Sequence, residues 1–241
     1  MTKGISSAQE RAWEKEYRKP QLLSKANDPQ GDVVRFYKFY RKTLKLQMDG
    51  KRCLDLGSGT GRNAYYFAEQ GAASVLGLEI SDTAIKLAEE RANEAGFSKI
   101  LTYKKQDMGL PFPLADESID LAIDITSSNS LNEAGRASYL RETYRVLAPG
   151  GIFFVKALCK DGDDNAKALL KKHPGKEYDT YYMQELDLYE RVFSREDFVK
   201  MYKDAGFEIL HIEKKTSYPK VNGRIFKRNQ LIAYMQKRAV K

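Results

Sequence analysis

Cysteine and histidine are scarce in this sequence, and their scarcity argues against several kinds of site. The chain of 241 residues holds two cysteines and two histidines. Cys53 and Cys159 both fall in predicted core strands, so we interpret them as small buried apolar residues and not as a disulfide or a metal pair. His173 and His211 are isolated and form no recognisable metal-binding cluster. We therefore expect no metal site.

Long apolar runs are also missing. No stretch of about 18 consecutive apolar residues occurs, so we expect no membrane-spanning helix. The N-terminus is charged and lacks the apolar core of a signal peptide, which favours a cytoplasmic protein over a secreted one. Hydrophobic residues make up 42% of the chain, which suffices for one α/β domain with a buried core. We expect a single domain over 1–241.

The glycine-rich loop of the chain lacks the marks of two common nucleotide-binding motifs. An apolar strand is predicted over 53–56, and it runs into Gly57, Gly59 and Gly61 and then into a predicted helix. A dinucleotide-binding loop would carry its third glycine where this chain has Arg62, and no Gly-Lys-Ser/Thr follows to make a P-loop. A strand, glycine turn and helix still present backbone N–H groups to a nucleotide-like ligand. The alternative is a plain tight turn that binds nothing.

The spacing of this loop resembles that of one enzyme family. The chain reads Asp55-x-Gly57-x-Gly59-x-Gly61, and residues 145–155 read RVLAPGGIFFV. Both strings resemble class I S-adenosylmethionine-dependent methyltransferases. The resemblance implies a Rossmann-like, doubly wound α/β fold. Such a fold has a seven-stranded, mostly parallel sheet with a C-terminal antiparallel strand, and helices on both faces.

The resemblance covers most of the chain with unequal strength. It is good over 50–158 and continues more loosely through 194–217, where a helix, a glycine stop and a strand are similar to the last αβ step of the family. Residues 226–237 would form the closing antiparallel strand. We therefore divide the domain into a donor-binding core at 50–159 and a C-terminal αβ part at 194–241.

Acidic residues come at the ends of the next two predicted strands. The strand over 73–80 carries Glu79, about 20 residues after the loop, where a carboxylate can accept hydrogen bonds from both hydroxyls of a ribose. The strand over 100–105 is followed by Asp107 and Met108. The resemblance implies that Asp107 contacts an adenine amino group and that Met108 packs on the ring. The alternative is that both residues only cap the loop.

The resemblance implies S-adenosylmethionine as the cofactor and S-adenosylhomocysteine as its product. In this family the glycine loop lets the methionine portion approach the backbone, and the acidic residue before the loop attracts the ammonium group. The loop after the fourth strand lies beside the sulfonium. Carried over residue by residue, the implied cofactor-binding set is Asp55, Gly57, Ser58, Gly59, Gly61, Asn63, Glu79, Ile80, Asp107, Met108 and Asp124.

The implied chemistry is an in-line displacement, which needs alignment more than acid–base catalysis. A general base is required only if the acceptor must lose a proton. No catalytic dyad or triad is visible, so the catalytic residues are unknown. The weak candidates for a base are Asp124, Tyr17, Tyr181 and His173; Asp124 could instead shape the methionine pocket.

The region before the core, 1–49, is predicted to be a helical cap. Trp13 and Tyr17 are four residues apart and share one helical face. Helices before the first strand often cover the donor site in small-molecule methyltransferases, so these two residues and Tyr37 are candidates for substrate contact. We interpret three other apolar residues of this region as helix-packing core: Phe36, Phe39 and Leu44.

The connection over 160–193 is long and rich in tyrosine. It contains a predicted helix at 164–172, then a break, then Tyr178, Tyr181, Tyr182 and Tyr189. We predict a lid or substrate-recognition element; an added edge hairpin or an oligomer contact are equal alternatives. The candidate substrate residues of the whole chain are Trp13, Tyr17, Tyr37, Asn129, Tyr181 and Tyr182.

The formal net charge of +8 is unevenly distributed. The basic excess lies in 1–52 and 214–241, whereas the segment between them has more acidic than basic residues. Basic flanks fit a nucleic acid, an anionic small substrate or an acidic protein, or are a solvated surface. The leading hypothesis is a small-molecule methyltransferase, monomeric or homodimeric. The alternatives are an RNA or protein methyltransferase and a non-catalytic donor-binding subunit.

Overall fold

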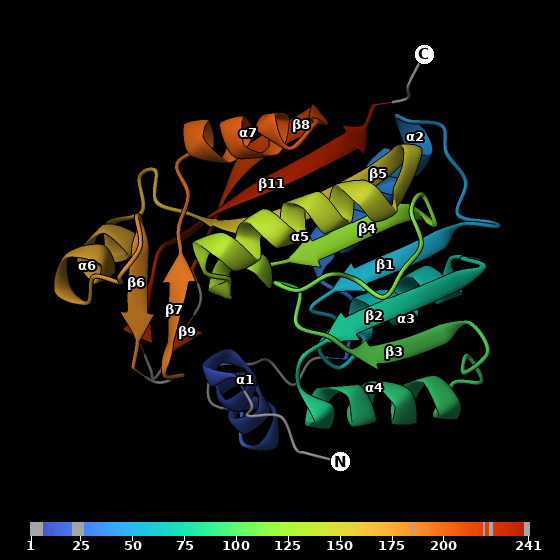
Figure 1. Ribbon diagram of the computed structural model, residues 1–241, viewed down its shortest axis with the longest axis horizontal. Coiled ribbons are helices and arrows are strands. Elements are labelled where there is room, and N and C mark those ends of the chain that lie inside the picture. Colours follow the sequence, from blue (N-terminus) through green and yellow to red (C-terminus); the bar gives the residue numbers. More distant parts are fainter. Residues whose placement is uncertain (1–6, 21–26, 185, 219, 222–223, 239–241) are drawn as a thin grey trace.

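The computed structural model describes all residues except 1–6, 21–26, 185, 219, 222–223 and 239–241. Seven strands form the central sheet in the order β3-β2-β1-β4-β5-β11-β8. These strands are β1 (Arg52–Leu56), β2 (Ser74–Glu79), β3 (Leu101–Lys105), β4 (Ile119–Ile125), β5 (Leu147–Cys159), β8 (Phe207–Ser217) and β11 (Arg228–Lys237). Strand β11 runs antiparallel to both its neighbours, β5 and β8, and the pairs from β3 to β5 are parallel. The predicted mostly parallel, seven-stranded sheet with one C-terminal antiparallel strand is confirmed (Figure 1).

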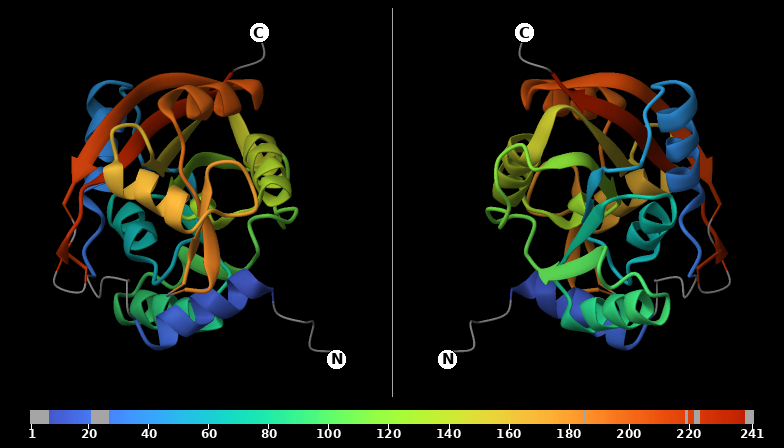
Figure 2. Two further views of the ribbon diagram at one scale, coloured as in Figure 1. Left: turned by 90° about the vertical axis from the view of Figure 1, so that its left-hand side faces the viewer. Right: turned by 90° about the vertical axis from the view of Figure 1, so that its right-hand side faces the viewer.

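Helices cover both faces of the sheet (Figure 2). The helices of the described residues are α1 (Ala8–Arg18), α2 (Gly31–Lys42), α3 (Arg62–Glu69), α4 (Asp82–Glu94), α5 (Glu133–Val146), α6 (Asp164–Lys172) and α7 (Arg195–Asp204), with a short 3-10 turn η1 (Ser128–Ser130). Alternate residues of β5 show the two layers, because successive side chains of a strand point to opposite faces. Phe154 stacks on Phe36 of α2 with 4.9 Å between the ring centroids. Phe153 points to the other face and packs against Tyr139 of α5 and Tyr202 of α7.

The parallel strands place their carboxyl ends along one edge of the sheet, and helix α1 lies across that edge (Figure 1). Helix α4 begins directly after β2, with Ser81 as its N-cap: its hydroxyl accepts a hydrogen bond from the Ala84 amide at 3.2 Å. Helix α3 begins after the glycine loop, with Gly61 in the left-handed conformation at its start. The residues that follow β1, β2, β3 and β4 therefore meet beneath α1.

The tyrosine-rich connection folds into α6 and a hairpin of β6 (Thr180–Met183) and β7 (Leu188–Arg191). This hairpin is a two-stranded sheet of its own and does not extend the central sheet, so the alternative of an added edge hairpin is wrong. Leu186 and Leu188 are buried against Ala12 of α1. The hairpin segment therefore packs against α1. A second small sheet pairs β9 (Lys220–Val221) with β10 (Arg224–Ile225).

None of the helices in the described part of the chain has the length and hydropathy that a membrane span requires. The described residues also contain no group of three or more histidine, cysteine, aspartate or glutamate side chains placed to hold a metal ion.

Candidate functional site

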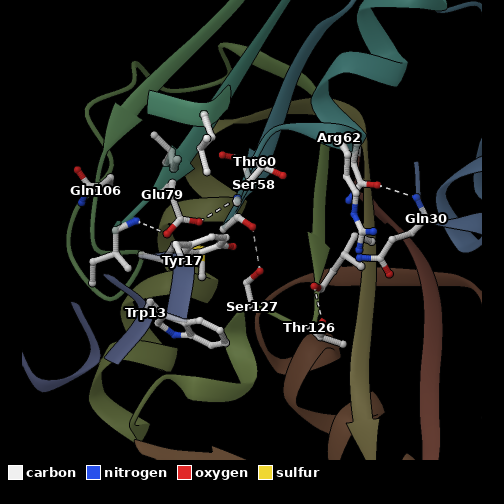
Figure 3. A pocket seen from close by; sticks show the side chains of 18 of the residues that line it. Trp13, Tyr17, Gln30, Ser58, Thr60, Arg62, Glu79, Gln106, Thr126 and Ser127 are labelled. Carbon is white, nitrogen blue, oxygen red and sulfur yellow. Dashed lines mark hydrogen bonds between the residues drawn. The ribbon is translucent and has the colours of Figure 1, made fainter. Parts of the chain in front are cut away.

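A cavity of about 550 Å³ lies at the carboxyl edge of the sheet, between the strand ends and α1. Its wall is built from the ends of β1, β2, β3 and β4, from the first turn of α3 and from α1 (Figure 3). Ten of the residues predicted from the sequence line it. They are Trp13, Tyr17, Gly57, Ser58, Gly59, Asn63, Glu79, Ile80, Asp107 and Met108.

The glycine loop forms the floor of this cavity, and its glycines are required by conformation and by space. Gly57 and Gly59 have φ of 67° and 55°, in the left-handed region that side chains rarely adopt. A Cβ on Gly59 would stand 2.5 Å from the Tyr17 hydroxyl, and one on Gly57 would collide with Ser127. Gly61 lies behind the cavity, where a Cβ would meet Tyr103. Gly61 therefore packs against Tyr103 and does not line the cavity. Its φ of 75° also requires glycine.

Glu79 is buried and held by backbone amides. Its Oε2 accepts a hydrogen bond from the Gly59 amide at 2.9 Å, and its Oε1 accepts from the amides of Ile80 and Ser81 at 2.8 and 2.9 Å. Burial raises the pKa of this carboxyl, and the three amides oppose the shift. Each carboxylate oxygen can accept more than one hydrogen bond, so a fixed Glu79 can still receive ligand hydroxyls.

Two further carboxyl groups, Asp55 and Asp124, are buried beneath the loop and do not line the cavity. Burial and the neighbouring carboxylates of Asp124 and Glu79 raise the pKa of Asp55 to about 7, and its Oδ2 has no hydrogen-bond partner among the described residues. Asp124 is fully engaged: its Oδ1 accepts from the Ser127 amide at 2.9 Å and its Oδ2 from the Tyr139 hydroxyl at 2.7 Å. Asp124 therefore shapes the loop after β4, and it does not reach an acceptor as a base.

The loop after β3 places Asp107 both at the cavity and at a cap of the loop itself. Asp107 lines the cavity, and its Oδ1 also caps the loop by accepting a hydrogen bond from the Gly109 amide at 2.8 Å. Gln106, which the sequence analysis did not single out, lines the cavity beside it and donates its side-chain amide to the Asp107 carbonyl at 2.8 Å.

Helix α1 brings Trp13 and Tyr17 to the cavity, with ring centroids 6.5 Å apart. In Figure 3 the Tyr17 ring lies beside Glu79 and Ser58, and the Trp13 ring lies farther from them. Burial, and next the Glu79 carboxylate, raise the pKa of Tyr17, so it remains a neutral phenol at physiological pH. Tyr17 can donate a hydrogen bond, but it is a poor general base.

Helix α1 is fixed to the start of α4 by Glu14. This carboxylate accepts hydrogen bonds from the hydroxyls of Ser81 and Thr83, each at 2.6 Å, and from the Thr83 amide at 3.1 Å. Burial would raise the pKa of Glu14, but these hydrogen bonds outweigh it and lower the pKa to about 2. A negative charge is also favourable at a helix N-terminus.

The structure places five other predicted residues away from the cavity lining. Tyr37 is buried in α2 and packs edge-on against Tyr66 at 5.8 Å, so its place in the core corrects the expected substrate contact. Asn129 is buried in η1 and donates to the Arg191 carbonyl at 2.6 Å, so it holds the hairpin against the loop after β4.

The remaining three, Tyr181, Tyr182 and His173, lie within the tyrosine-rich connection and not at the cavity, and of these only Tyr181 is buried. The Tyr181 hydroxyl is buried and donates to Glu190 at 2.6 Å; burial raises its pKa. The Tyr182 hydroxyl donates to Asp187 at 2.6 Å, and its amide bonds the carbonyl of His173, which ends α6. The density of phenols is explained by contacts inside this segment, and none of these three residues stands at the cavity as a base.

Sequence reasoning missed two polar residues of the cavity lining, Arg62 and Gln30. The loop after β4, which the resemblance placed beside the sulfonium, contributes Thr126 and Ser127 to the lining. Arg62 is the first residue of α3, and its position directly after the loop was the available signal. Thr126 has a φ of 65°, which is unusual for a residue with a side chain, and it follows β4 directly. No sequence signal pointed to Gln30.

Comparison with known proteins agrees with this geometry. Residues 47–215 match the model of a methyltransferase-domain family. A phthiotriol/phenolphthiotriol dimycocerosates methyltransferase of Mycobacterium ulcerans is 32% identical over 131 residues, which cover 54% of this chain and 45% of that protein. A sterol 24-C-methyltransferase of Aspergillus fumigatus is 30% identical over 173 residues, or 71% and 43% of the two chains. The chain spans about half the length of these curated relatives.

The fold has solved counterparts. The 1,6-didemethyltoxoflavin-N1-methyltransferase of Burkholderia thailandensis, crystallised with 1,6-didemethyltoxoflavin and S-adenosylhomocysteine, superposes with a TM-score of 0.71. The superposition covers 96% of this chain and 88% of that one at 15% sequence identity. Because the family model spans more than half of the sequence, the chain belongs to the class I S-adenosylmethionine-dependent methyltransferases.

Proposed function

We propose that this protein binds S-adenosylmethionine in the cavity and transfers its methyl group to a small molecule. The observation that carries the proposal is the set of three buried carboxyl groups around the glycine loop, those of Asp55, Glu79 and Asp124. Glu79 lines the cavity, whereas Asp55 and Asp124 are buried beneath its floor. Carboxyl groups in and beneath a site of low dielectric favour a ligand that carries positive charge. The donor carries two positive charges, one on the sulfonium and one on the ammonium group.

The residues present fit this donor. Gly57 and Gly59 line the cavity, and the absence of their side chains lets Ser127 and Tyr17 stand close to the backbone of the loop. Glu79 would receive the ribose hydroxyls, and Asp107 and Met108 would contact the adenine. The unpartnered Oδ2 of Asp55 is a buried acceptor that the ammonium group would balance by charge, directly or through water.

When bound, S-adenosylmethionine supplies an activated methyl group on a sulfonium. The protein has to hold that group in line with a nucleophile and keep water out, and orientation alone can contribute about 7–11 kcal/mol to such a step. Trp13 and Tyr17, on α1, line the cavity. The segment that holds the β6–β7 hairpin packs against the same helix. No histidine lines the cavity among the described residues. An acceptor that is already nucleophilic, such as a neutral amine or an acidic phenol, suits this lining.

A small acceptor is supported by the size of the cavity and by the similar proteins, which are named for phthiotriol or phenolphthiotriol dimycocerosates, for a sterol and for 1,6-didemethyltoxoflavin. Part of the basic excess has a structural explanation. Lys215, in the basic C-terminal flank, forms an ion pair at 2.7 Å with the buried Asp32 at the start of α2, which also pairs with Lys156 at 2.8 Å. The Lys215 charge is therefore not free to bind a nucleic acid.

The donor assignment is tested by calorimetric titration with S-adenosylhomocysteine, and with NAD as a second ligand. Binding of the first and not of the second is expected. An absence of heat with S-adenosylhomocysteine, or tighter binding of NAD, would overturn the proposal. The acceptor is then sought by incubating the protein with methyl-labelled donor and fractions of a cell extract, separated by size. Label should appear in small-molecule fractions and not in RNA or protein.

A further inference from the structure

The exposed apolar side chains of the described residues gather at one edge of the central sheet. Those that are large and exposed are Leu87, Leu110, Tyr178, Tyr189, Tyr218 and Ile225. Leu87 lies on α4, which follows β2, and Leu110 lies in the loop that follows β3. Tyr178 and Tyr189 lie in the connection that follows β5. Single exposed apolar residues are common on protein surfaces, so the information lies in their one-sided distribution.

Tyr218 and Ile225 belong to the same edge, although they lie near the end of the chain. The first residues of β11 pair with Cys159 at the end of β5 and with Ser217 at the end of β8. The segment between β8 and β11 therefore projects beyond the carboxyl edge, and there Tyr218 and Ile225 are 67% and 68% exposed. Figure 1 shows β9 of this segment on the same side as α6 and β7. Where the structure describes the loops of the opposite edge, they contribute no exposed large apolar side chain.

Basic residues accompany these apolar side chains. Residues 214–228 contain six lysines and arginines and no acidic residue. Lys215 is held in an ion pair, whereas Lys227 is exposed. In the connection after β5, Lys171 and Lys172 are exposed in the last turn of α6. An anionic surface that approached this edge would therefore meet positive charge on both segments.

A lipid surface fits this arrangement better than a folded protein or an RNA. A protein interface is built around a closely packed apolar centre, whereas the exposed side chains here come from four separate segments. A bilayer accepts separate side chains, with tyrosine at the interface and lysine reaching the headgroups. RNA stacks its bases on aromatic rings, which the aliphatic Ile225 and Leu110 do not offer.

We propose that the carboxyl edge of this protein docks on an anionic lipid surface. Tyr178, Tyr218 and Ile225 enter the interface, and the basic residues of α6 and of 214–228 contact the headgroup phosphates. Docking in this way brings the cavity, which lies at the same edge, close to molecules dissolved in the lipid. None of the three inserted side chains lines the cavity, so the inference does not depend on the ligand that the cavity holds.

The test is flotation of the full chain with vesicles of phosphatidylcholine and phosphatidylglycerol, and with vesicles of phosphatidylcholine alone. The protein should float with the anionic vesicles, and its binding should weaken as salt is added. The double variant Tyr218→Ser/Ile225→Ser should bind about tenfold more weakly, because it removes apolar surface from the interface. Tyr218→Phe/Ile225→Leu is its control and should bind as the wild type does.

A second pair of variants tests the charge. Lys172→Ser should weaken binding to the anionic vesicles about fivefold, since it removes one positive charge near the headgroups. Lys99→Ser is the matched control, because Lys99 is also exposed but lies in the loop before β3, at the opposite edge. Salt screens a charge at that distance, so this variant should bind normally. A thermal unfolding curve for each variant shows that it is folded.

Three results would overturn the inference. The wild type could fail to float with the anionic vesicles, the serine double variant could float as well as the wild type, or Lys99→Ser could lose as much binding as Lys172→Ser. A protein that ignores the vesicles and binds a tRNA pool with a steep salt dependence would assign the basic segments to a nucleic acid instead. None of these results bears on the binding of S-adenosylhomocysteine, so the proposed function is tested separately.

Discussion

At the scale of single residues, Glu79 is the clearest case in which a sequence position, a geometry and a role coincide. The sequence placed an acidic residue at the end of the second strand, and the structure fixes its carboxylate with three backbone amides at the cavity wall. A rigid acceptor of this kind binds ligand hydroxyls without a further loss of side-chain entropy.

Glu79→Ala should weaken binding of S-adenosylhomocysteine by about tenfold or more, which corresponds to about 1.4 kcal/mol. The physical reason is the loss of the ribose acceptor together with its three amide contacts. Calorimetric titration measures the effect. Glu89→Ala, at an exposed position on α4, is the control and should bind normally; an unchanged affinity in Glu79→Ala would remove Glu79 from the site.

Asp55 gives a prediction about pH and stability. Its pKa is about 7 in the folded protein, above the ordinary value of 3.8, because of burial and then the Asp124 and Glu79 carboxylates. The folded state therefore binds more protons than the unfolded state between those values, and the contribution of Asp55 to stability is lost as the pH rises from about 4 through 7.

Asp55→Asn removes this titration. The ligand-free variant should gain stability relative to the wild type as the pH increases from 5 to 8, as measured by chemical denaturation at each pH. A difference between the two proteins that stays constant with pH would show that Asp55 is ionised at an ordinary pKa.

At the scale of elements, helix α1 forms one wall of the cavity and is held there by contacts with two segments that are distant in the chain. Glu14 joins it to the start of α4, and Ala12 packs against Leu186 and Leu188 beside the hairpin. The tyrosine-rich connection thus acts on the site through α1. Its own phenols, Tyr181 and Tyr182, make hydrogen bonds within the hairpin segment.

Glu14→Gln should speed the dissociation of S-adenosylhomocysteine by about tenfold, since it removes hydrogen bonds to a charged group that hold α1 closed. Stopped-flow displacement measures the rate. Lys15→Gln changes a charge on the exposed side of the same helix and should leave the rate unchanged. Equal rates in all three proteins would mean that α1 does not limit release.

At the scale of the whole molecule, one apolar layer ties the N-terminal region to the central sheet. Phe36 of α2 is buried, and its ring centroid lies 4.9 Å from that of Phe154 of β5 and 5.1 Å from that of Tyr234 of β11. These three aromatic residues come from segments far apart in the chain. They join the helix before the first strand to the last strand of the fold.

Phe36→Ala should lower the free energy of unfolding by about 3–5 kcal/mol, as usual for removal of a buried aromatic ring. Denaturant titration measures this loss, and Phe39→Ala, at a half-buried neighbour, should lose less. The affinity of the folded Phe36→Ala protein for S-adenosylhomocysteine should be unchanged, because α2 contributes Phe36 to the core and not to the cavity. A selective loss of binding would contradict this placement.

The sequence by itself determined the fold class and the donor side of the site. Strands, turns and helices follow from local periodicity and from glycine positions. The carboxyl ends of parallel strands must share one edge, so Gly57, Gly59, Glu79 and Asp107 could be grouped in advance. Each of these residues is placed by its own strand, a few residues away.

Only the tertiary structure decided how the remaining elements dock. Trp13 and Tyr17 reach the cavity whereas Tyr37 enters the core, and Asp124 turns beneath the loop after β4. Arg62 and Gln30 line the same cavity although no local pattern links them. The physical reason is that the docking of a helix or hairpin depends on packing and hydrogen bonds with segments distant in the chain, and these leave no local signal in the sequence.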